Sequence, residues 1–419
     1  MRIAIIGAGI AGLGAAYLLQ RRHQITIFEA QARVGGHTHT HSVVQNGKAY
    51  EVDSGFIVFN PGNYPLLTRL FAELGVESQP TTMSFSVKNE LTGLEYNATN
   101  LNAMFCQRRN LFRPAFLGMV REILRFYREA PALLNSPDPG PTIGQYLQAH
   151  RYGPLFISDH LIPMASALWS SPPEQVSEFP AKYLVQFMAN HQMLDASNRP
   201  EWRVVKGGSS RYLDKLIPAI RAQIHLDSRV TQVLREPDRV RLQTATGEEY
   251  FDQVIFACHS DQALGMIGDS SDAERDLLGA ISFQRNDTVL HTDASLLPRN
   301  PKAWAAWNVL RMREDSRAAT DPACTVSYCM NLLQALSSEK PFIVSLNATA
   351  RIDPKQIIAR MDYAHPVYTH VAVAAQQRWH EINGVNRSWY CGAWWGWGFH
   401  EDGLRSGVRV AEALGASWD

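Results

Sequence analysis

Cysteine is scarce in this chain of 419 residues, and long hydrophobic runs are missing. The cysteines are odd in number and never spaced C-x-x-C: Cys106, Cys258, Cys324, Cys329 and Cys391. This pattern is typical of reduced thiols and argues against a disulfide framework or a metal site; no metal is expected. No apolar run approaches the roughly 18 to 20 residues that cross a bilayer. The first residues run directly into an apolar stretch, so we expect no signal peptide and a cytoplasmic location.

Net charge is also missing, because 40 lysines and arginines balance 40 aspartates and glutamates. A nucleic-acid-binding protein would show a basic surplus, so no nucleic-acid partner is expected. Hydrophobic residues make up 45% of the chain, which is ordinary for a globular protein with a large core. The length is comfortable for two domains, and the oligomeric state is left open.

The first forty residues contain the clearest motif. An apolar run at residues 3–6 leads into GAGIAG at residues 7–12, and a helical stretch rich in alanine and leucine follows. A second apolar run at residues 24–28 ends on Glu29. Strand, glycine-rich turn, helix, strand and acid in this order predict a dinucleotide-binding βαβ unit.

Each special residue of this unit has a physical role. Gly7 permits a sharp turn, Gly9 lets the backbone approach a pyrophosphate, and Gly12 lets the helix pack closely on the sheet. The start of the helix offers free N–H groups and a positive dipole end to phosphate. Glu29 is placed to bind the hydroxyls of an adenosine ribose, and its charge would repel the 2′-phosphate of NADP.

The sequence EAQARVGGHT at residues 29–38 resembles the E-A-x-x-R-x-G-G-R-x stretch of the flavin-containing amine oxidase and phytoene desaturase superfamily. The resemblance implies FAD as the cofactor. It also implies an α/β fold, with a Rossmann-like FAD domain (parallel sheet with a β-meander) and a discontinuous α+β substrate domain. In that family the arginine and the glycine pair, here Arg33, Gly35 and Gly36, wrap the diphosphate and ribityl chain. His37 stands where the family usually has arginine, and a histidine can be neutral at pH 7.

Three more segments resemble the same family. Residues 52–57 match the segment beside the flavin ring, Val230 matches the residue that holds the adenine, and residues 389–407 match the closing strand, glycine loop and helix. The N-terminus of that helix stabilises negative charge on reduced flavin. Ala393 departs from the family, which has an acid there. The predicted FAD contacts are Gly7, Gly9, Gly12, Glu29, Arg33, Gly35, Gly36, His37, Thr38, Gly55, Phe56, Val230, Gly392, Phe399, His400 and Gly403.

The resemblance also predicts how the chain is divided. The FAD domain is expected in three segments, at residues 1–77, 200–260 and 385–419. The substrate domain is expected in two, at residues 78–199 and 261–384. Within them the pattern predicts a hairpin at Asn46-Gly47, a helix at residues 65–74 that ends at Gly75, and a helix at residues 212–223.

Two features have alternative interpretations. His37, His39 and His41 would share one face of a strand. A polar strand face near the cofactor is the preferred interpretation, and a metal site is the alternative.

The helical tract at residues 111–134 is apolar on one side and rich in arginine. A helix covering a domain is the preferred interpretation, and peripheral contact with the inner membrane face through residues 108–128 is the alternative.

The resemblance implies an FAD-dependent oxidoreductase that removes a hydride from a C–H bond. The C-terminal pattern resembles a bacterial subgroup linked with fatty-acyl modification, which favours a lipid desaturase or dehydrogenase. An aromatic cage of Trp394, Trp395, Trp397 and Phe399 would instead suit an amine oxidase. A catalytically idle flavin-binding partner protein is the hypothesis of another class. His400 and Glu401 are the candidate acid/base pair, with helix capping as the alternative role.

Overall fold

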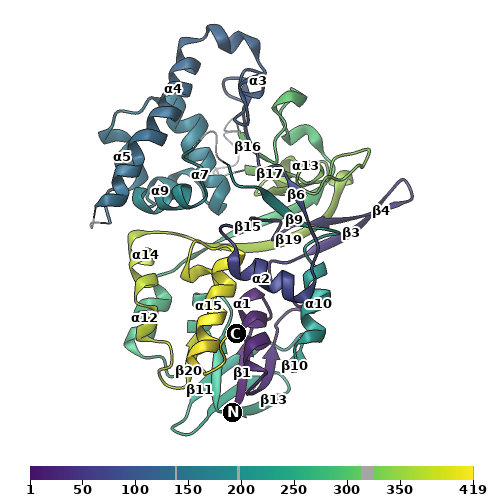
Figure 1. Cartoon of the computed structure of the whole chain (residues 1–419), viewed down its shortest axis with the longest axis vertical. Helices are drawn as coiled ribbons and strands as arrows, with labels where there is room; N and C mark the ends of the chain where they lie inside the picture. Colours follow the sequence, from purple (N-terminus) through teal and green to yellow (C-terminus); the bar gives the residue numbers. More distant parts are fainter. Residues whose placement is uncertain (137–138, 196–198, 313–324, 419) are drawn as a thin grey trace.

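The computed structural model describes residues 1–136, 139–195, 199–312 and 325–418. A five-stranded parallel sheet, in the order β10-β2-β1-β14-β20, forms the lower part of the molecule in Figure 1. A seven-stranded mixed sheet, in the order β19-β15-β18-β17-β16-β7-β8, lies above it. The predicted α/β class is confirmed.

The parallel sheet gathers segments from both ends and the middle of the chain. Its strands are β1 (Arg2–Ile6), β2 (Gln24–Phe28), β10 (Ala222–His225), β14 (Gln253–Phe256) and β20 (Ser388–Tyr390). Successive side chains of a strand point to opposite faces. Ile3 and Ile5 therefore pack against helices on one face, while Ala4 and Ile6 pack against a β-meander on the other. Both faces are covered, as an all-parallel sheet requires.

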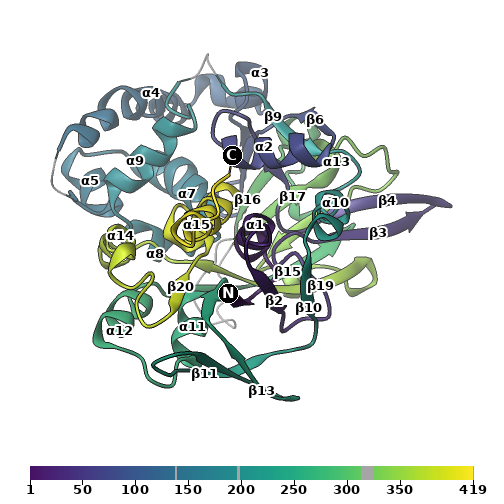
Figure 2. The ribbon, with the colours of Figure 1, turned by 60° about the horizontal axis from the view of Figure 1, so that its bottom comes forward.

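Two helices from opposite ends of the chain lie side by side on the first face, α1 (Ile10–Leu19) and α15 (His400–Ala413) (Figure 2). They can approach closely because residue 407 is a glycine and has no side chain. A Cβ there would lie 2.3 Å from the Ala11 carbonyl oxygen. Helices α2 (Pro65–Leu74) and α10 (Arg211–Ala219) complete this layer. The other face carries the meander β11 (Val230–Arg235), β12 (Val240–Thr244) and β13 (Gly247–Phe251), with α11 (Ser260–Met266), α12 (Asp272–Gly279) and α14 (His370–Gln377).

The mixed sheet is built from central segments of the chain. Its strands are β7 (Phe85–Asn89), β8 (Leu94–Asn97), β15 (Phe283–His291), β16 (Trp307–Arg311), β17 (Thr325–Cys329), β18 (Ile343–Leu346) and β19 (Ile357–Pro366), and α13 (Met330–Leu333) follows β17. A small sheet joins β5 (Val58–Phe59), β9 (Trp202–Val205) and β6 (Ser78–Thr81), and β3 (Thr40–Gln45) pairs with β4 (Lys48–Asp53).

A helical region covers the remaining side of the mixed sheet and forms the end of the molecule farthest from the N-terminus (Figure 1). It contains α3 (Leu101–Met104), α4 (Pro114–Glu129), α5 (Ile143–Ala149), α6 (Pro154–Phe156), α7 (Ile162–Trp169), α8 (Pro173–Ser177) and α9 (Ala181–Asn190). The expected helical tract at residues 111–134 is α4 between two 3-10 segments, Arg108–Phe112 and Ala130–Asn135. Prolines near the start of α4 and of the second 3-10 segment separate them, because proline is tolerated in a first helical turn and not in a helix interior.

The local predictions have mixed outcomes. The Asn46-Gly47 turn has positive φ at both residues, as a type I′ turn requires, and α2 ends at Gly75 in the left-handed conformation. The prediction of a helix at residues 212–223 is wrong at its C-terminal end, because α10 is shorter than predicted. It ends at Ala219, directly after Pro218, and the chain then enters edge strand β10.

Within the described residues no helix is both long and apolar enough to cross a membrane. The same residues contain no group of three histidine, cysteine or acidic side chains placed to hold a metal ion. Cys106, Cys258, Cys329 and Cys391 are free thiols, and Cys324 lies outside the described residues.

Candidate cofactor and substrate cavity

A cavity of about 1790 Å³ runs from the carboxyl ends of β1 and β2 into the mixed sheet and the helical region. Ligands bind at this edge of doubly wound α/β sheets, where the strands end and loops converge. Nearly all the predicted FAD contacts line one part of the cavity; among them only Gly12 and Thr38 do not. The lining residues are Gly7, Gly9, Glu29, Arg33, Gly35, Gly36, His37, Gly55, Phe56, Val230, Gly392, Phe399, His400 and Gly403.

Gly12 and Thr38 support the cavity from behind. A Cβ at Gly12 would lie 2.2 Å from the Gly7 carbonyl oxygen, so glycine is needed there for α1 to pack on the strand. The Thr38 hydroxyl is buried and lies 2.7 Å from the Tyr212 hydroxyl and 3.1 Å from His400 Nε2. Its interactions are therefore with the protein.

The start of α1 forms an open cradle. The N-cap residue Gly9 provides no side-chain cap, and a Cβ placed on it would meet nothing within 4 Å. Gly35 and Gly36 have φ of 107° and 58°, and a Cβ on Gly36 would lie 3.2 Å from the Gly9 Cα. Free N–H groups, a positive dipole end and space for an anion meet here, so the residues present fit the diphosphate of a dinucleotide.

Glu29 is held in one position at the cavity edge. Its Oε2 accepts a hydrogen bond from the Ala8 N–H at 2.8 Å, and its Oε1 accepts one from the Gln31 N–H at 2.9 Å. Each carboxylate oxygen can accept a further hydrogen bond. The carboxylate is therefore oriented before a ligand arrives and can receive two hydroxyls.

We expect Glu29→Ala to reduce the affinity for FAD by about tenfold to a hundredfold, because both charge-assisted hydrogen bonds to the ribose are lost. The measurement is fluorescence titration of the flavin-depleted protein with FAD. Glu77→Ala, an exposed glutamate paired with Lys206, is the control. Unchanged FAD affinity in Glu29→Ala would show that this carboxylate does not bind the cofactor.

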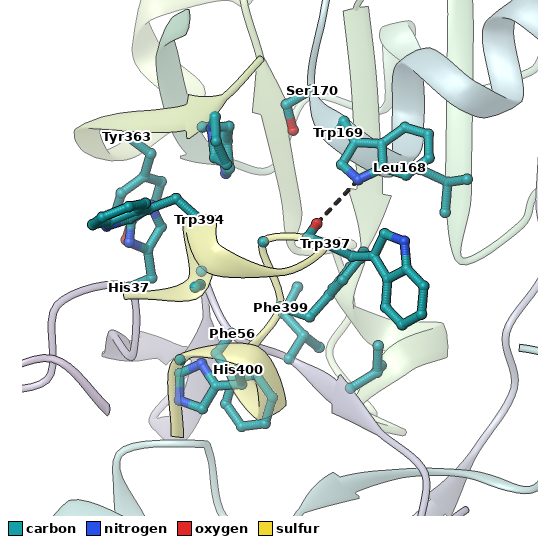
Figure 3. Close-up of a pocket in the computed structure, with 18 of the residues that line it drawn as sticks. His37, Phe56, Leu168, Trp169, Ser170, Tyr363, Trp394, Trp397, Phe399 and His400 are labelled. Carbon is teal, nitrogen blue, oxygen red and sulfur yellow. Dashed lines mark hydrogen bonds between the residues drawn. The ribbon is translucent and has the colours of Figure 1, made fainter. Parts of the chain in front are cut away.

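Arg33 and His37 fix the glycine loop and its surroundings. The Arg33 guanidinium donates to the carbonyl oxygens of Gly36 at 2.8 Å and Thr38 at 3.0 Å, so it braces the loop that it belongs to. His37 lies against Tyr363, with ring centroids 4.9 Å apart (Figure 3). Burial, with help from His259 and Arg33, lowers the pKa of His37 to about 4. The imidazole is neutral and gives no full charge in place of the family arginine. Its buried Nε2 has no hydrogen-bond partner among the described residues, which leaves it available to a ligand.

His400 is a neutral wall residue at the start of α15. Its ring stacks on Phe56, with centroids 3.8 Å apart (Figure 3), and its Nε2 lies 2.9 Å from the Tyr212 hydroxyl. Burial, followed by the neighbouring His37, lowers its pKa to about 3. A histidine with this pKa does not exchange protons near neutral pH, so its contribution is shape and a hydrogen bond.

The structure contradicts the pairing of His400 with Glu401. Both Glu401 carboxylate oxygens are 3.0 Å from backbone N–H groups, those of Leu66 and Leu67 at the start of α2. Consecutive residues of a helix do not face each other, so the two side chains point in different directions. Glu401 is absent from the described cavity wall and caps α2.

The predicted aromatic cage is also only partly formed. Trp394, Trp397 and Phe399 line the cavity, but Trp395 lies in the core beneath the parallel sheet, where its indole N–H donates to the Tyr390 carbonyl. Trp169 also belongs to this wall, although no sequence pattern indicated it, and its indole N–H donates to the Trp397 carbonyl at 3.1 Å (Figure 3). No sequence signal joined them, because 228 positions separate the two residues.

The far part of the cavity is mainly apolar. It is lined by side chains of α4, α7, α9, the turn after α9 and the mixed sheet, among them Val120, Ile123, Leu168, Phe187, Met193 and Phe85. His160, Ser170 and His191 add polar groups to the same wall. The carboxylates in the described wall are those of Glu29, Glu201, Asp261 and Asp362. Of these, Asp362 is paired with Arg285, and Glu201 with Arg203.

The sequence matches the family model described as flavin containing amine oxidoreductase over residues 10–276. It is 49% identical over 51 residues to protoporphyrinogen oxidase 2, chloroplastic/mitochondrial, of Arabidopsis thaliana, which is 12% of this chain and 10% of that protein. The chain therefore aligns with only a tenth of that curated relative.

Solved structures resemble the whole chain at low identity. Cyclohexylamine oxidase from Brevibacterium oxydans IH-35A superposes with a TM-score of 0.67 at 15% identity, covering 99% of this chain and 98% of its own. The CLA-producing fatty acid isomerase from P. acnes superposes with a TM-score of 0.63 at 17% identity, covering 98% of both. These likenesses establish a shared fold.

Proposed function

Because the chain belongs to the family of flavin-containing amine oxidoreductases, whose cofactor is FAD, we propose that it removes a hydride from a C–H bond of a fatty-acyl chain, as a lipid desaturase or dehydrogenase. The observation that carries the proposal is the apolar far part of the cavity. Its wall offers an alkyl chain extensive hydrophobic contact, which stabilises binding in proportion to the apolar area buried. A fatty acid isomerase with the same fold supports this substrate class.

The residues of the chain have separable tasks in this proposal. Bound FAD supplies the electron-accepting chemistry. The glycine cradle and Glu29 hold its diphosphate and ribose, and the positive end of α15 at the cavity wall favours negative charge there. Trp397, Phe399 and Trp169 exclude water from the cavity. Forming the double bond also releases a proton from the carbon next to the one that loses the hydride, and the neutral His37 of the cavity wall, whose Nε2 has no partner among the described residues, can accept it. His400 contributes shape and a hydrogen bond.

An amine substrate is the second candidate. Trp394, Trp397 and Phe399 offer aromatic faces to a cation, and cyclohexylamine oxidase shares the fold. A cationic amine also gains from a free carboxylate. In the described wall Glu201 and Asp362 are paired with arginines. Glu29 and Asp261 have no ion pair within the described part of the chain, but they follow β2 and β14 at the carboxyl end of the parallel sheet, where the cofactor contacts lie, so the far part of the cavity favours a neutral alkyl group.

Anaerobic titration with unsaturated phospholipids, and separately with amines, tests the proposal. We expect the lipid, and not the amines, to bleach the flavin absorbance. We expect Leu168→Trp to reduce the bleaching by lipid at least tenfold, because the indole fills the alkyl site. Leu332→Trp, at an exposed leucine outside the cavity wall, is the control. Bleaching by amines alone would favour amine oxidation, and no bleaching by either would favour the idle flavin-binding protein.

A further inference from the structure

Exposed apolar side chains gather at the end of the molecule formed by α3, the 3-10 segment Arg108–Phe112 and α4. Phe112 is 86% exposed, Leu101 74% and Leu124 57%, so each presents most of its apolar surface to water. Exposed arginines are interspersed among them. This apolar–arginine patch consists of Leu101, Leu111, Phe112, Leu117 and Leu124 with Arg108, Arg109, Arg113, Arg121 and Arg128.

The two faces of α4 explain why the patch is not core. Phe116, Met119, Ile123 and Phe126 recur at helical spacing and are buried against the other helices. The opposite face repeats leucine and arginine at positions 117, 121, 124 and 128, also at helical spacing, and is exposed. A helix that only covered a domain would carry polar residues on that face. The preferred interpretation from the sequence is therefore incomplete.

The charge of the patch is mainly positive. Six arginines lie between residues 108 and 128, and the acidic residues beside them are Glu122 and Glu129. Glu129 pairs with Arg125 at 2.9 Å and with Arg128 at 3.0 Å, which leaves Arg108, Arg109, Arg113 and Arg121 without an ion pair among the described residues. The Glu122 carboxylate accepts a hydrogen bond from the Gly153 N–H at 2.8 Å, which turns it toward the protein. Interspersed arginine and large apolar side chains match the headgroup and acyl boundary of an anionic bilayer.

The patch also meets the cavity. Leu101 and Leu124 are exposed patch residues and line the cavity, together with Met104, Val120 and Tyr127 from the same helices. The apolar far part of the cavity therefore reaches the surface between α3 and α4. This end of the molecule projects away from the parallel sheet (Figure 1), so a flat surface can approach it.

We infer that the apolar–arginine patch docks on the surface of an anionic phospholipid bilayer, and that acyl chains enter the cavity from the membrane between α3 and α4. The arginines neutralise headgroup phosphates, and Phe112 and Leu101 insert into the acyl boundary. The route of the substrate rests on the proposed function; docking itself does not.

Vesicle sedimentation of the flavin-loaded protein tests docking without turnover. We expect binding to vesicles of phosphatidylglycerol and phosphatidylcholine, and much weaker binding to phosphatidylcholine alone. Leu101→Ser/Phe112→Ser should lower the partition coefficient at least tenfold, and Arg121→Gln about fivefold at low salt. The matched controls are Val44→Ser/Val371→Ser, at valines 69% and 65% exposed elsewhere, and Arg360→Gln. Unchanged flavin content verifies that each variant is folded.

Equal binding to both kinds of vesicle, or to neither, overturns docking. Docking is also overturned if the protein binds a soluble acidic protein through this patch and does not bind vesicles. Flavin bleaching by detergent-dispersed lipid, without vesicle binding, would overturn docking and leave the proposed function intact. Vesicle binding without bleaching by any lipid would support docking and contradict the function instead.

Discussion

Acidification from pH 8 to pH 5.5 is expected to lower the free energy of unfolding by roughly 6 kcal/mol, a large part of the 5–15 kcal/mol typical of a domain. The cause is a set of buried and half-buried histidines that are neutral in the folded protein. Burial lowers the pKa of His37, His259 and His291 to about 4 and that of His160, His365 and His400 to about 3. The unfolded chain binds protons near pH 6.5 where the folded chain does not, so stability falls as the pH drops below that value.

The magnitude follows from linkage. At pH 5.5 each of these histidines favours the unfolded state by roughly 1.4 kcal/mol. Asp53 and Asp402 act in the opposite direction, because burial raises the pKa of each to about 6 and the folded state takes up their protons first. Together these two aspartates offset the loss in the free energy of unfolding at pH 5.5 by roughly 2 kcal/mol.

Urea unfolding of the flavin-depleted protein at pH 8, 6.5 and 5.5 measures this loss. His160→Gln should flatten the profile by one histidine's share, because the buried His160 contributes one of the shifted titrations. His380→Gln, at an exposed histidine, is the control for the substitution itself. A free energy of unfolding that is flat from pH 8 to 5.5 would contradict the buried neutral histidines.

The FAD side of the molecule was largely predictable because its signals are local. Gly7, Gly9 and Glu29 lie within one βαβ unit, where spacing along the chain fixes the spacing in the fold. The strand alternation at Ile3 to Ile6 and the proline and glycine at the ends of α2 likewise act through nearest neighbours. Such features need no knowledge of distant contacts.

The substrate side was less predictable because its contacts join distant positions. Tyr363 meets His37 from a strand more than 300 residues away, and Trp169 at the end of α7 meets Trp397 in the loop before α15. Glu401 had the right type for an acid/base group and a suitable place beside His400. Its role depends on α2 docking against α15, which no pattern in either segment encodes.

Gly407→Ala tests whether the two ends of the chain must pack together to form the cofactor site. The added Cβ would lie 2.3 Å from the Ala11 carbonyl oxygen and 3.2 Å from the Ala15 nitrogen, so α15 must move away from α1. We expect the free energy of unfolding to fall by about 1–3 kcal/mol. We expect FAD affinity to fall with it, because both helix N-termini belong to the cavity wall.

Gly118→Ala in α4 is the matched control. Its Cβ meets nothing within 4 Å, and helix propensity alone should stabilise this variant by up to about 1 kcal/mol. Urea unfolding and flavin content measure both variants. If Gly407→Ala behaves like Gly118→Ala, close packing of α1 against α15 is not what holds the site together.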